Sequence, residues 1–340
     1  MSTADPDDRG LFQAAAWDGR PPLLVRGLGL LASGLFALFL AATGQFLPHD
    51  ERFLGMTARQ LCALRGCRVV HFMIHDRLAF GGALAAVGLL YLWLVAFPLR
   101  QRRAWAWWLL LVSGAIGFAS FLTYLGYGYL DVWHGLATLA LLPCFALGLA
   151  RSRGTLAGSS LGVCCLLTSA VCVPWTSPYG VGRACLLATA VGMIGGGLTI
   201  LAVGTTCVFV PQDLVYLGLS VGELHGLSPR LVPLIAHDRA GFGGAVCCGG
   251  LVLFFAIWCG EPSRSLWQVL ALAGLVGFGS AIGAHPAVSY NDGVHLAPAA
   301  CGATLYLAGL ILTWRRMVRG GGSTSIADPP GRGPFVERSK

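Results

Sequence analysis

The sequence predicts an all-α, polytopic membrane protein with eight or nine transmembrane helices, formed by internal duplication of a four-helix unit. Of its 340 residues, 56% are hydrophobic and only 11% are charged, whereas a soluble domain carries about 25% charged residues. Several apolar stretches reach about 20 residues, which is enough to cross a hydrocarbon core of about 30 Å. The same ionisable residues also recur in both halves of the chain.

The recurring ionisable residues are what indicate a duplication. IHDRLAFGGA near residue 75 matches AHDRAGFGGA near residue 237, an offset of 162 (237 − 75). Upstream, FLPHDERFLG matches FVPQDLVYLG, and downstream a Tyr-x-Asp-x-x-His pattern occurs in both halves. Apolar helices resemble one another by chance, so the matched polar residues carry the argument. The matched pairs are His75 and His237, Asp76 and Asp238, Arg77 and Arg239, Asp50 and Asp213, Asp131 and Asp292, and His134 and His295.

Each unit is expected to contain four membrane-spanning helices. The first unit covers residues 22–150 and the second covers residues 186–315. Apolar runs bounded by polar, glycine or proline residues set the expected helix ends. The expected helices are 22–44, 69–97, 104–125 and 131–150 in the first unit, and 186–208, 232–259, 265–284 and 293–314 in the second.

The two terminal segments differ from the apolar units. Residues 1–21 are polar, and the first span after them is read as a retained helix because its repeat partner is internal. Residues 316–340 combine glycine, serine and proline with alternating charge. This composition predicts a disordered C-terminal tail.

The linker at residues 151–185 decides how the two units are related. Its segment Leu156–Trp175 is apolar enough to form a ninth span, which would invert the second unit as in many transporters. If that segment is re-entrant or interfacial, eight spans and parallel units follow. Its apolarity favours nine spans, whereas the basic ends of both units favour parallel copies.

Arginines at helix ends predict the orientation. They follow the second and fourth helices of the first unit and the last helix of the second, and the positive-inside rule places such loops in the cytoplasm. The histidines and aspartates of the first unit then lie on the outer side. Cys62 and Cys67 lie in an outer loop, where an oxidising compartment would permit a disulfide. We expect a multi-pass protein of the plasma membrane, such as a bacterial inner membrane.

The matched histidines suggest a haem site in each unit. The second and fourth helices of a unit enter the membrane from the same side, so residues at their starts share one depth. Two opposed imidazoles on different helices suit the iron of haem b, and a four-helix bundle can enclose it. The expected axial pairs are His75 with His134 and His237 with His295, with Arg77 and Arg239 beside the haem propionates.

A metal ion is the competing chemistry. A shell of imidazoles and carboxylates with one open position for water suits Zn²⁺ or Fe²⁺. The carboxylates expected to take part are Asp50, Asp76, Asp131, Asp213, Asp238 and Asp292. Some could instead have a purely structural role, since aspartates at helix starts commonly cap the helix. Asp131 and Asp292 fit that role.

The arrangement of two fused four-helix units resembles haem A synthase. In that family, each unit has one histidine at the start of its second helix and another at the start of its fourth. The first outer loop can carry a cysteine pair, as Cys62 and Cys67 do here. The glutamate that the family places shortly before the first histidine is absent, since residues 71–74 read HFMI. The resemblance implies haem binding by the four matched histidines.

Three functional classes follow from these residues. The leading one is a membrane redox or cofactor-handling protein, which would exchange electrons with a quinone or another electron-transfer partner. The alternatives are a metal-dependent hydrolase acting on lipid-like substrates and a secondary transporter built from inverted repeats. The basic residues are scattered and form no nucleic-acid-binding face. The bilayer is therefore the one partner that composition requires.

Overall fold

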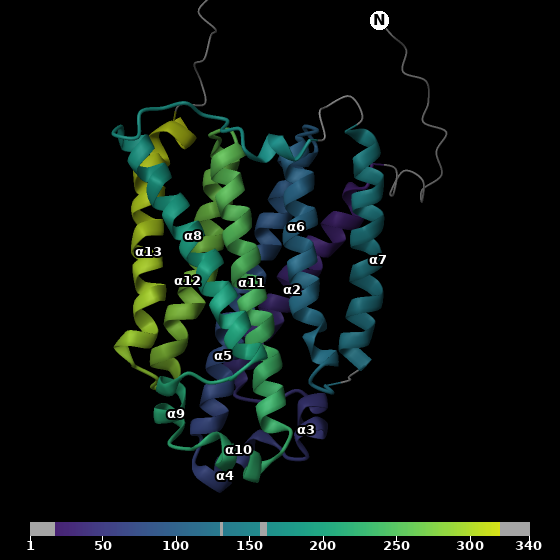
Figure 1. The fold of residues 1–340 in the computed structure, drawn as a ribbon, viewed down its shortest axis with the longest axis vertical. Helices are drawn as coiled ribbons and strands as arrows, with labels where there is room; N and C mark the ends of the chain where they lie inside the picture. The colour runs from purple at the N-terminus through teal and green to yellow at the C-terminus, as the bar shows by residue number, and fades with distance from the viewer. Residues whose placement is uncertain (1–17, 130–131, 157–161, 320–340) are drawn as a thin grey trace, which may run out of the picture.

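The computed structural model describes residues 18–129, 132–156 and 162–319, and its regular structure is entirely helical. Eight helices are long and apolar enough to cross a membrane, and they form one bundle (Figure 1). The predicted terminal segments lie almost wholly outside the described residues. The spanning helices are α2 (Arg20–Thr43), α5 (Arg68–Leu94, continued to Leu99), α6 (Ala104–Phe121), α7 (Val132–Thr155), α8 (Pro178–Thr205), α11 (Leu231–Cys259), α12 (Arg264–Val288) and α13 (Gly293–Trp314, continued to Arg319).

Four short helices form a cap at one end of the bundle (Figure 1). They are α3 (Pro48–Leu54), α4 (Ala58–Arg65), α9 (Pro211–Leu217) and α10 (Val221–Leu227). The matched helices start in the same way. In α3 and α9 a proline occupies the first turn, where its missing N–H costs nothing. In α4 and α10 a Thr-x-x-Gln or Ser-x-x-Glu capping box satisfies the first backbone N–H groups.

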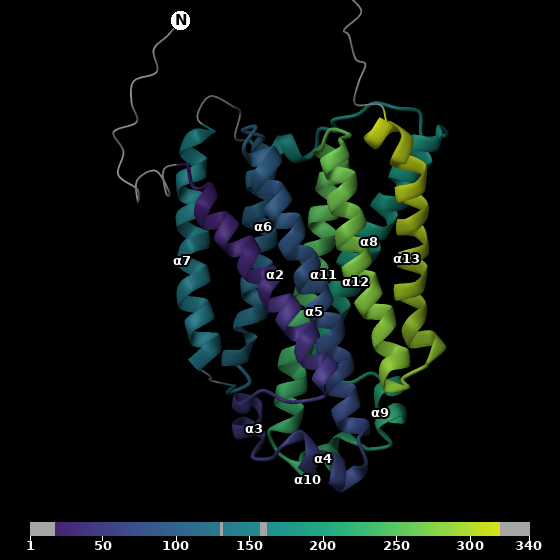
Figure 2. The ribbon, with the colours of Figure 1, turned by 180° about the vertical axis from the view of Figure 1, so that it is seen from behind.

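The two halves, 18–155 and 178–319, are parallel, and the predicted ninth span is not formed by the described residues. Both α2 and α8 run toward the cap (Figure 2). The loops after α5 and α11 meet at the opposite end, where Arg103 and Glu261 form an ion pair of 2.5 Å. The described helices therefore form two parallel halves and not inverted repeats.

The described part of the linker lies at the end of the bundle opposite the cap, where polar contacts hold it (Figure 1). Between α7 and α8, the described linker residues form only a short 3-10 turn at Val163–Leu166 and irregular chain. The buried Arg183 of α8 donates to the carbonyl oxygens of Val171 and Ile257. The Ala170 N–H donates to the carbonyl of Trp258. The apolar composition of Leu156–Trp175 predicted a ninth span. In the described residues of this segment, polar contacts are formed in place of a spanning helix.

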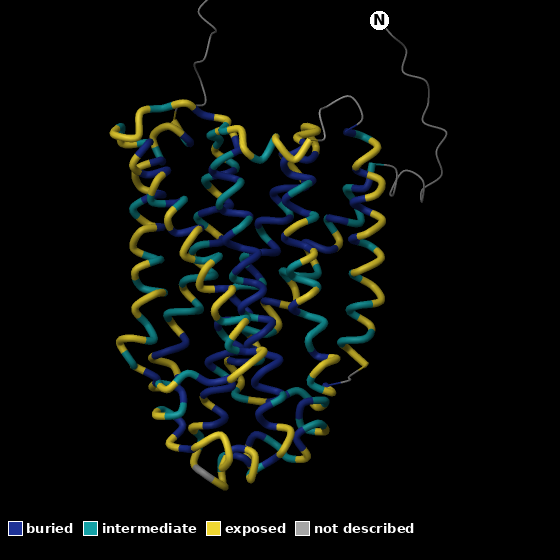
Figure 3. Tube along the Cα trace, viewed as in Figure 1, coloured by how far each residue is buried: buried dark blue, intermediate teal, exposed yellow. Residues whose placement is uncertain are grey.

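Helices α5 and α11 form the centre of the bundle. Most of each is buried, whereas at most a third of the most apolar stretch of each of the other six spans is buried (Figure 3). Within each half, the first helix packs closely on the second. A Cβ at Gly34 would lie 2.4 Å from the backbone N of Ala85, and one at Gly197 would lie 2.4 Å from that of Cys247. Small residues allow such close approach in membranes.

The central helices also exchange partners between the halves. Helix α5 packs on α12 of the second half, and α11 packs on α6 of the first. Two matched contacts make this possible: Gly82 lies against Ser280, and Gly244 lies against Ser120. Each site at the capped end is consequently assembled from both halves.

Candidate metal centre

Three histidines from three helices converge at the capped end of the bundle. His75 lies on α5, His285 in the last turns of α12, and His295 in the first turn of α13. One ring nitrogen from each lies within 4.8 Å of the others. An ion at the centre of such a triangle would be at most about 2.8 Å from each nitrogen, so small side-chain shifts would allow bonds of about 2.0–2.1 Å.

The hydrogen bonds of His75 and His285 leave their inner nitrogens without partners. The Nδ1 of His75 lies 3.1 Å from the carboxylate of Asp76, and the Nδ1 of His285 lies 3.0 Å from the carbonyl oxygen of Ala281. Because both partners are acceptors, each Nδ1 is the donor in these contacts, and each Nε2 is the ring nitrogen left for another partner. Both Nε2 atoms are buried and have no hydrogen-bond partner. Histidines that bind metals are commonly oriented in this way through the other nitrogen.

His295 completes the group from the partly exposed side. Its Nδ1 lies 3.4 Å from the hydroxyl of Tyr290 and 4.0 Å from a carboxylate oxygen of Asp213. The Tyr290 hydroxyl donates to that same carboxylate at 2.9 Å. Burial raises the pKa of Tyr290, and the adjacent Asp213 charge raises it further, so this hydroxyl stays protonated. The Nδ1 of His295 therefore also faces a fixed polar partner.

The matched position in the other half holds a pair of histidines. The Nε2 atoms of His134 on α7 and His237 on α11 lie 3.2 Å apart. The rings of Phe121, Tyr124 and Tyr129 surround His134, with centroids 5.0–5.5 Å away. His237 is buried, and its Nδ1 has no hydrogen-bond partner.

Two buried arginines link the sites. Each bridges one aspartate of its own half and one aspartate of the other half, and all six side chains are buried. The aspartates compensate the buried positive charges, and the cross-half contacts tie the two central helices together. The four contacts are Arg77–Asp50 (2.6 Å), Arg77–Asp238 (3.2 Å), Arg239–Asp213 (2.6 Å) and Arg239–Asp76 (3.0 Å).

Asp50 is held as a carboxylate by several contacts. Its side chain accepts hydrogen bonds from the Tyr129 hydroxyl and from the backbone N–H of Leu47. Burial alone would raise the pKa of Asp50, but the guanidinium of Arg77 and these hydrogen bonds outweigh it and lower the pKa. Burial and the Asp50 charge raise the pKa of Tyr129. The tyrosine is thus the donor and the aspartate the acceptor.

The structure corrects the pairing predicted from the repeats. His75 contacts His285 and His295, whereas His134 contacts His237, so each group combines the two halves. The reason is that α5 packs on α12 of the second half and α11 packs on α6 of the first half. A comparison of matched residues could not reveal this packing.

The predicted roles of the arginines and aspartates also change. Arg77 and Arg239 face aspartates, so they are not placed to neutralise propionates. Four of the aspartates predicted as ligands form ion pairs with them instead, because a buried guanidinium requires a compensating charge. Asp292 caps α13 by accepting from the His295 N–H at 2.7 Å. Asp131 lies outside the described residues.

His285 was missed because its matched position holds a different residue. An offset of 161 (295 − 134) aligns His285 with Tyr124, so a search for matched histidines omits it. The available signal was an ionisable residue inside an apolar span, which commonly marks a functional site.

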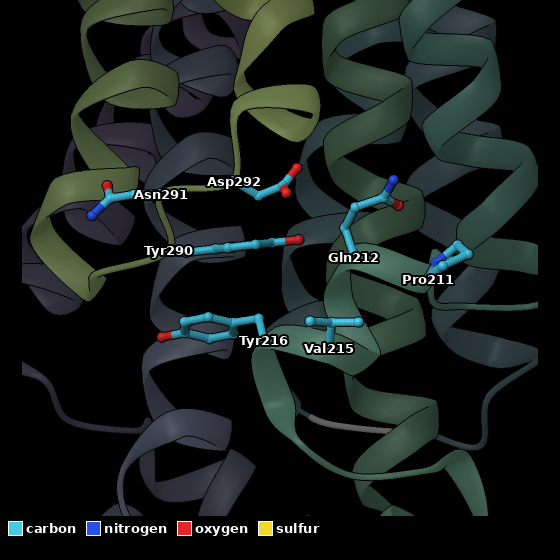
Figure 4. Close-up of a pocket in the computed structure, with 7 residues that line it drawn as sticks. All are labelled: Pro211, Gln212, Val215, Tyr216, Tyr290, Asn291 and Asp292. Atoms are coloured by element: carbon cyan, nitrogen blue, oxygen red, sulfur yellow. The ribbon is translucent and has the colours of Figure 1, made fainter.

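A surface pocket is lined in part by Tyr290, whose hydroxyl lies 3.4 Å from the Nδ1 of His295. It has a volume of about 340 Å³ and lies between α9 and the turn joining α12 to α13 (Figure 4). The ring of Tyr290 forms part of its wall and stacks on Tyr216 at 4.5 Å. The pocket therefore approaches His295 through Tyr290. Its lining residues are Pro211, Gln212, Val215, Tyr216, Tyr290, Asn291 and Asp292.

Comparisons with known proteins were made at three levels. No family model, curated protein or solved structure matches this chain.

Proposed function

We propose that this protein is an integral membrane metalloprotein that binds one divalent transition-metal ion, zinc or ferrous iron, through His75, His285 and His295. The observation that carries the proposal is the orientation of the first two imidazoles. Their Nδ1 atoms are engaged, while their Nε2 atoms are buried, without partners and near the third histidine.

Three protein ligands with one open position are typical of a catalytic rather than a structural metal site. A bound ion would supply Lewis acidity and would lower the pKa of a coordinated water. Asp76 holds the ring of His75, and the Tyr290 hydroxyl stands beside His295 at the wall of the pocket. We therefore favour metal-dependent hydrolysis, with a substrate that reaches Tyr290 from the capped surface.

Haem b in a redox role is the second candidate, supported by the resemblance of the helical arrangement to haem A synthase. Opposed imidazoles on one iron would place their nitrogens about 4 Å apart, twice a bond of about 2.0 Å. The His134 and His237 nitrogens are 3.2 Å apart, with ring planes at 70°. This spacing does not fit a haem between them, so a quinone or electron-transfer partner belongs to this second candidate alone.

We propose the plasma membrane as the location, with the metal centre at the outer face, as in a bacterial inner membrane. The arginine-rich ends lie opposite the cap, which fits the positive-inside rule. The disulfide between Cys62 and Cys67 lies on the capped side. An oxidising compartment at that side would preserve it.

Metal analysis of the purified protein tests the proposal. We expect zinc or iron to bind in the wild type, and we expect His285→Ala to lose that metal. His71→Ala is the matched control, because His71 is an exposed residue one turn before His75 on α5. Equal metal content in both variants would refute the assignment. A haem absorption spectrum that depends on His75 or His237 would favour the second candidate.

A further inference from the structure

We infer that His134 and His237, together with His49, form a second site for a divalent transition-metal ion. These residues come from α7, α11 and α3, and none of them belongs to the centre at His75. The inference therefore extends the proposed function without depending on it.

The spacing of the two nitrogens is the first support. Two metal–imidazole bonds of about 2.0–2.1 Å at a tetrahedral angle place their nitrogens about 3.3 Å apart. The Nε2 atoms of His134 and His237 are 3.2 Å apart, and the two rings meet edge to face. The pair thus already has the separation of two ligands on one ion.

The buried Nδ1 of His237 is the second support. His237 is 5% exposed, and its Nδ1 has no hydrogen-bond partner. The matched His75 has its Nδ1 fixed by Asp76. His237 therefore has its polar contact at Nε2, toward His134, while its other buried ring nitrogen is unsatisfied. A bound ion would provide a favourable interaction for an imidazole buried away from water.

His49 supplies the third imidazole. It lies at the start of α3, and its ring centroid is 6.0 Å from that of His134. The comparison of the halves supports this role. In the second half, Gln212 takes the place of His49 (213 − 50 gives an offset of 163), and the third histidine is His285 on α12. With His49, the second site would also have three imidazoles, the third from a different helix. The His49 ring would have to move toward the pair, since among the described residues only the centre at His75 has three ligand atoms within 4.8 Å of one another.

The charges near the pair favour a cation. Asp50 and Asp238 lie on one side of the site, and Arg77 is the arginine paired with both. Two carboxylates against one guanidinium leave one net negative charge. His49 itself approaches Asp50, with Nε2 3.7 Å from the carboxylate. Divalent zinc or ferrous iron fits an imidazole site in this surrounding.

Equilibrium dialysis of the full-length, detergent-solubilised protein against Zn²⁺ tests the inference. The wild type is expected to bind two ions. His134→Ala and His285→Ala are each expected to bind one, and the double variant none. His49→Ala should weaken one of the two ions at least tenfold, whereas Tyr124→Phe and the exposed His225→Ala should retain both.

The outcomes separate the two sites. If His134→Ala and His49→Ala both bind as much zinc as the wild type, His134 and His237 are only a hydrogen-bonded pair and the inference fails. If zinc binding is lost in His134→Ala but unchanged in His285→Ala, the inference stands and the proposed centre at His75 fails. Thermal unfolding of each variant checks that it is folded. If His134→Ala does not fold, His49→Ala decides the outcome, because His49 lies on the short cap helix α3 and not in a spanning helix.

Discussion

The guanidinium of Arg239 lies 3.0 Å from the carboxylate of Asp76, although 163 residues separate them in the sequence. The matched contact joins Arg77 to Asp238 at 3.2 Å. Both contacts cross between the halves at the level of the histidines. The ion pairs therefore hold α5 and α11 in the register that assembles both sites.

Removing Arg239 should destabilise the protein strongly. In Arg239→Met, Asp76 and Asp213 would remain buried without their partner, which costs about 3–5 kcal/mol. Glu261→Gln breaks the exposed pair with Arg103 and should cost only about 0–1 kcal/mol. Unfolding midpoints in detergent measure both variants. Similar shifts for the two would contradict the role of the buried pairs.

Adjacent glycines on α8 should respond differently to alanine. In Gly197→Ala the new Cβ would lie 2.4 Å from the backbone N of Cys247, so α8 and α11 would have to separate. In Gly196→Ala the Cβ would meet nothing within 4 Å. We expect a lower unfolding temperature for Gly197→Ala alone. Equal temperatures would mean that the helices do not approach as closely as described.

Acid should destabilise the protein partly through Asp50. Its pKa in the folded chain is lowered from the usual 3.8, so its charge contributes stability above about pH 4 that is lost as the pH falls through the folded pKa. Asp50→Asn should be less stable near pH 7 and should lose less stability between pH 5 and 3. Glu51→Gln controls for the removal of one charge. Parallel pH profiles for Asp50→Asn and the wild type would contradict this.

The parallel halves predict the labelling of two loops. Gln101→Cys and Glu261→Cys should both react with a membrane-impermeant maleimide from the cytoplasmic side and neither from the outside. Labelling of the two loops from opposite sides of the membrane would contradict this prediction and indicate inverted halves. The parent for this experiment should carry serine at the exposed cysteines Cys164, Cys172, Cys207 and Cys301.

The sequence was sufficient for the fold class because composition dictates it. Long apolar runs need helices to satisfy their backbone groups in lipid. Each of the eight spans predicted within the two units corresponds to an observed helix, whereas the ninth, in the linker, is not formed by the described residues. Helix α8 begins at Pro178, eight residues before the expected start, because Ser177 caps it and the buried Arg183 lies within it. A prediction from average hydrophobicity placed the start of α8 too late, because the first turns of this helix contain a charged residue.

The sequence could not show which histidines come together in each site, and the reason is different. Matching the halves found His75, His134, His237 and His295, because duplication preserves position. It could not show that α5 and α11 exchange partners, since tertiary packing determines which helices meet. It also excluded His285 and His49, whose matched positions hold Tyr124 and Gln212.

Anomalous diffraction at the zinc edge, from crystals of the full chain grown with zinc, tests the metal centre most directly. A peak among His75, His285 and His295, about 2.0–2.1 Å from one ring nitrogen of each, is the expected result. A map with no peak among these three imidazoles would contradict the account.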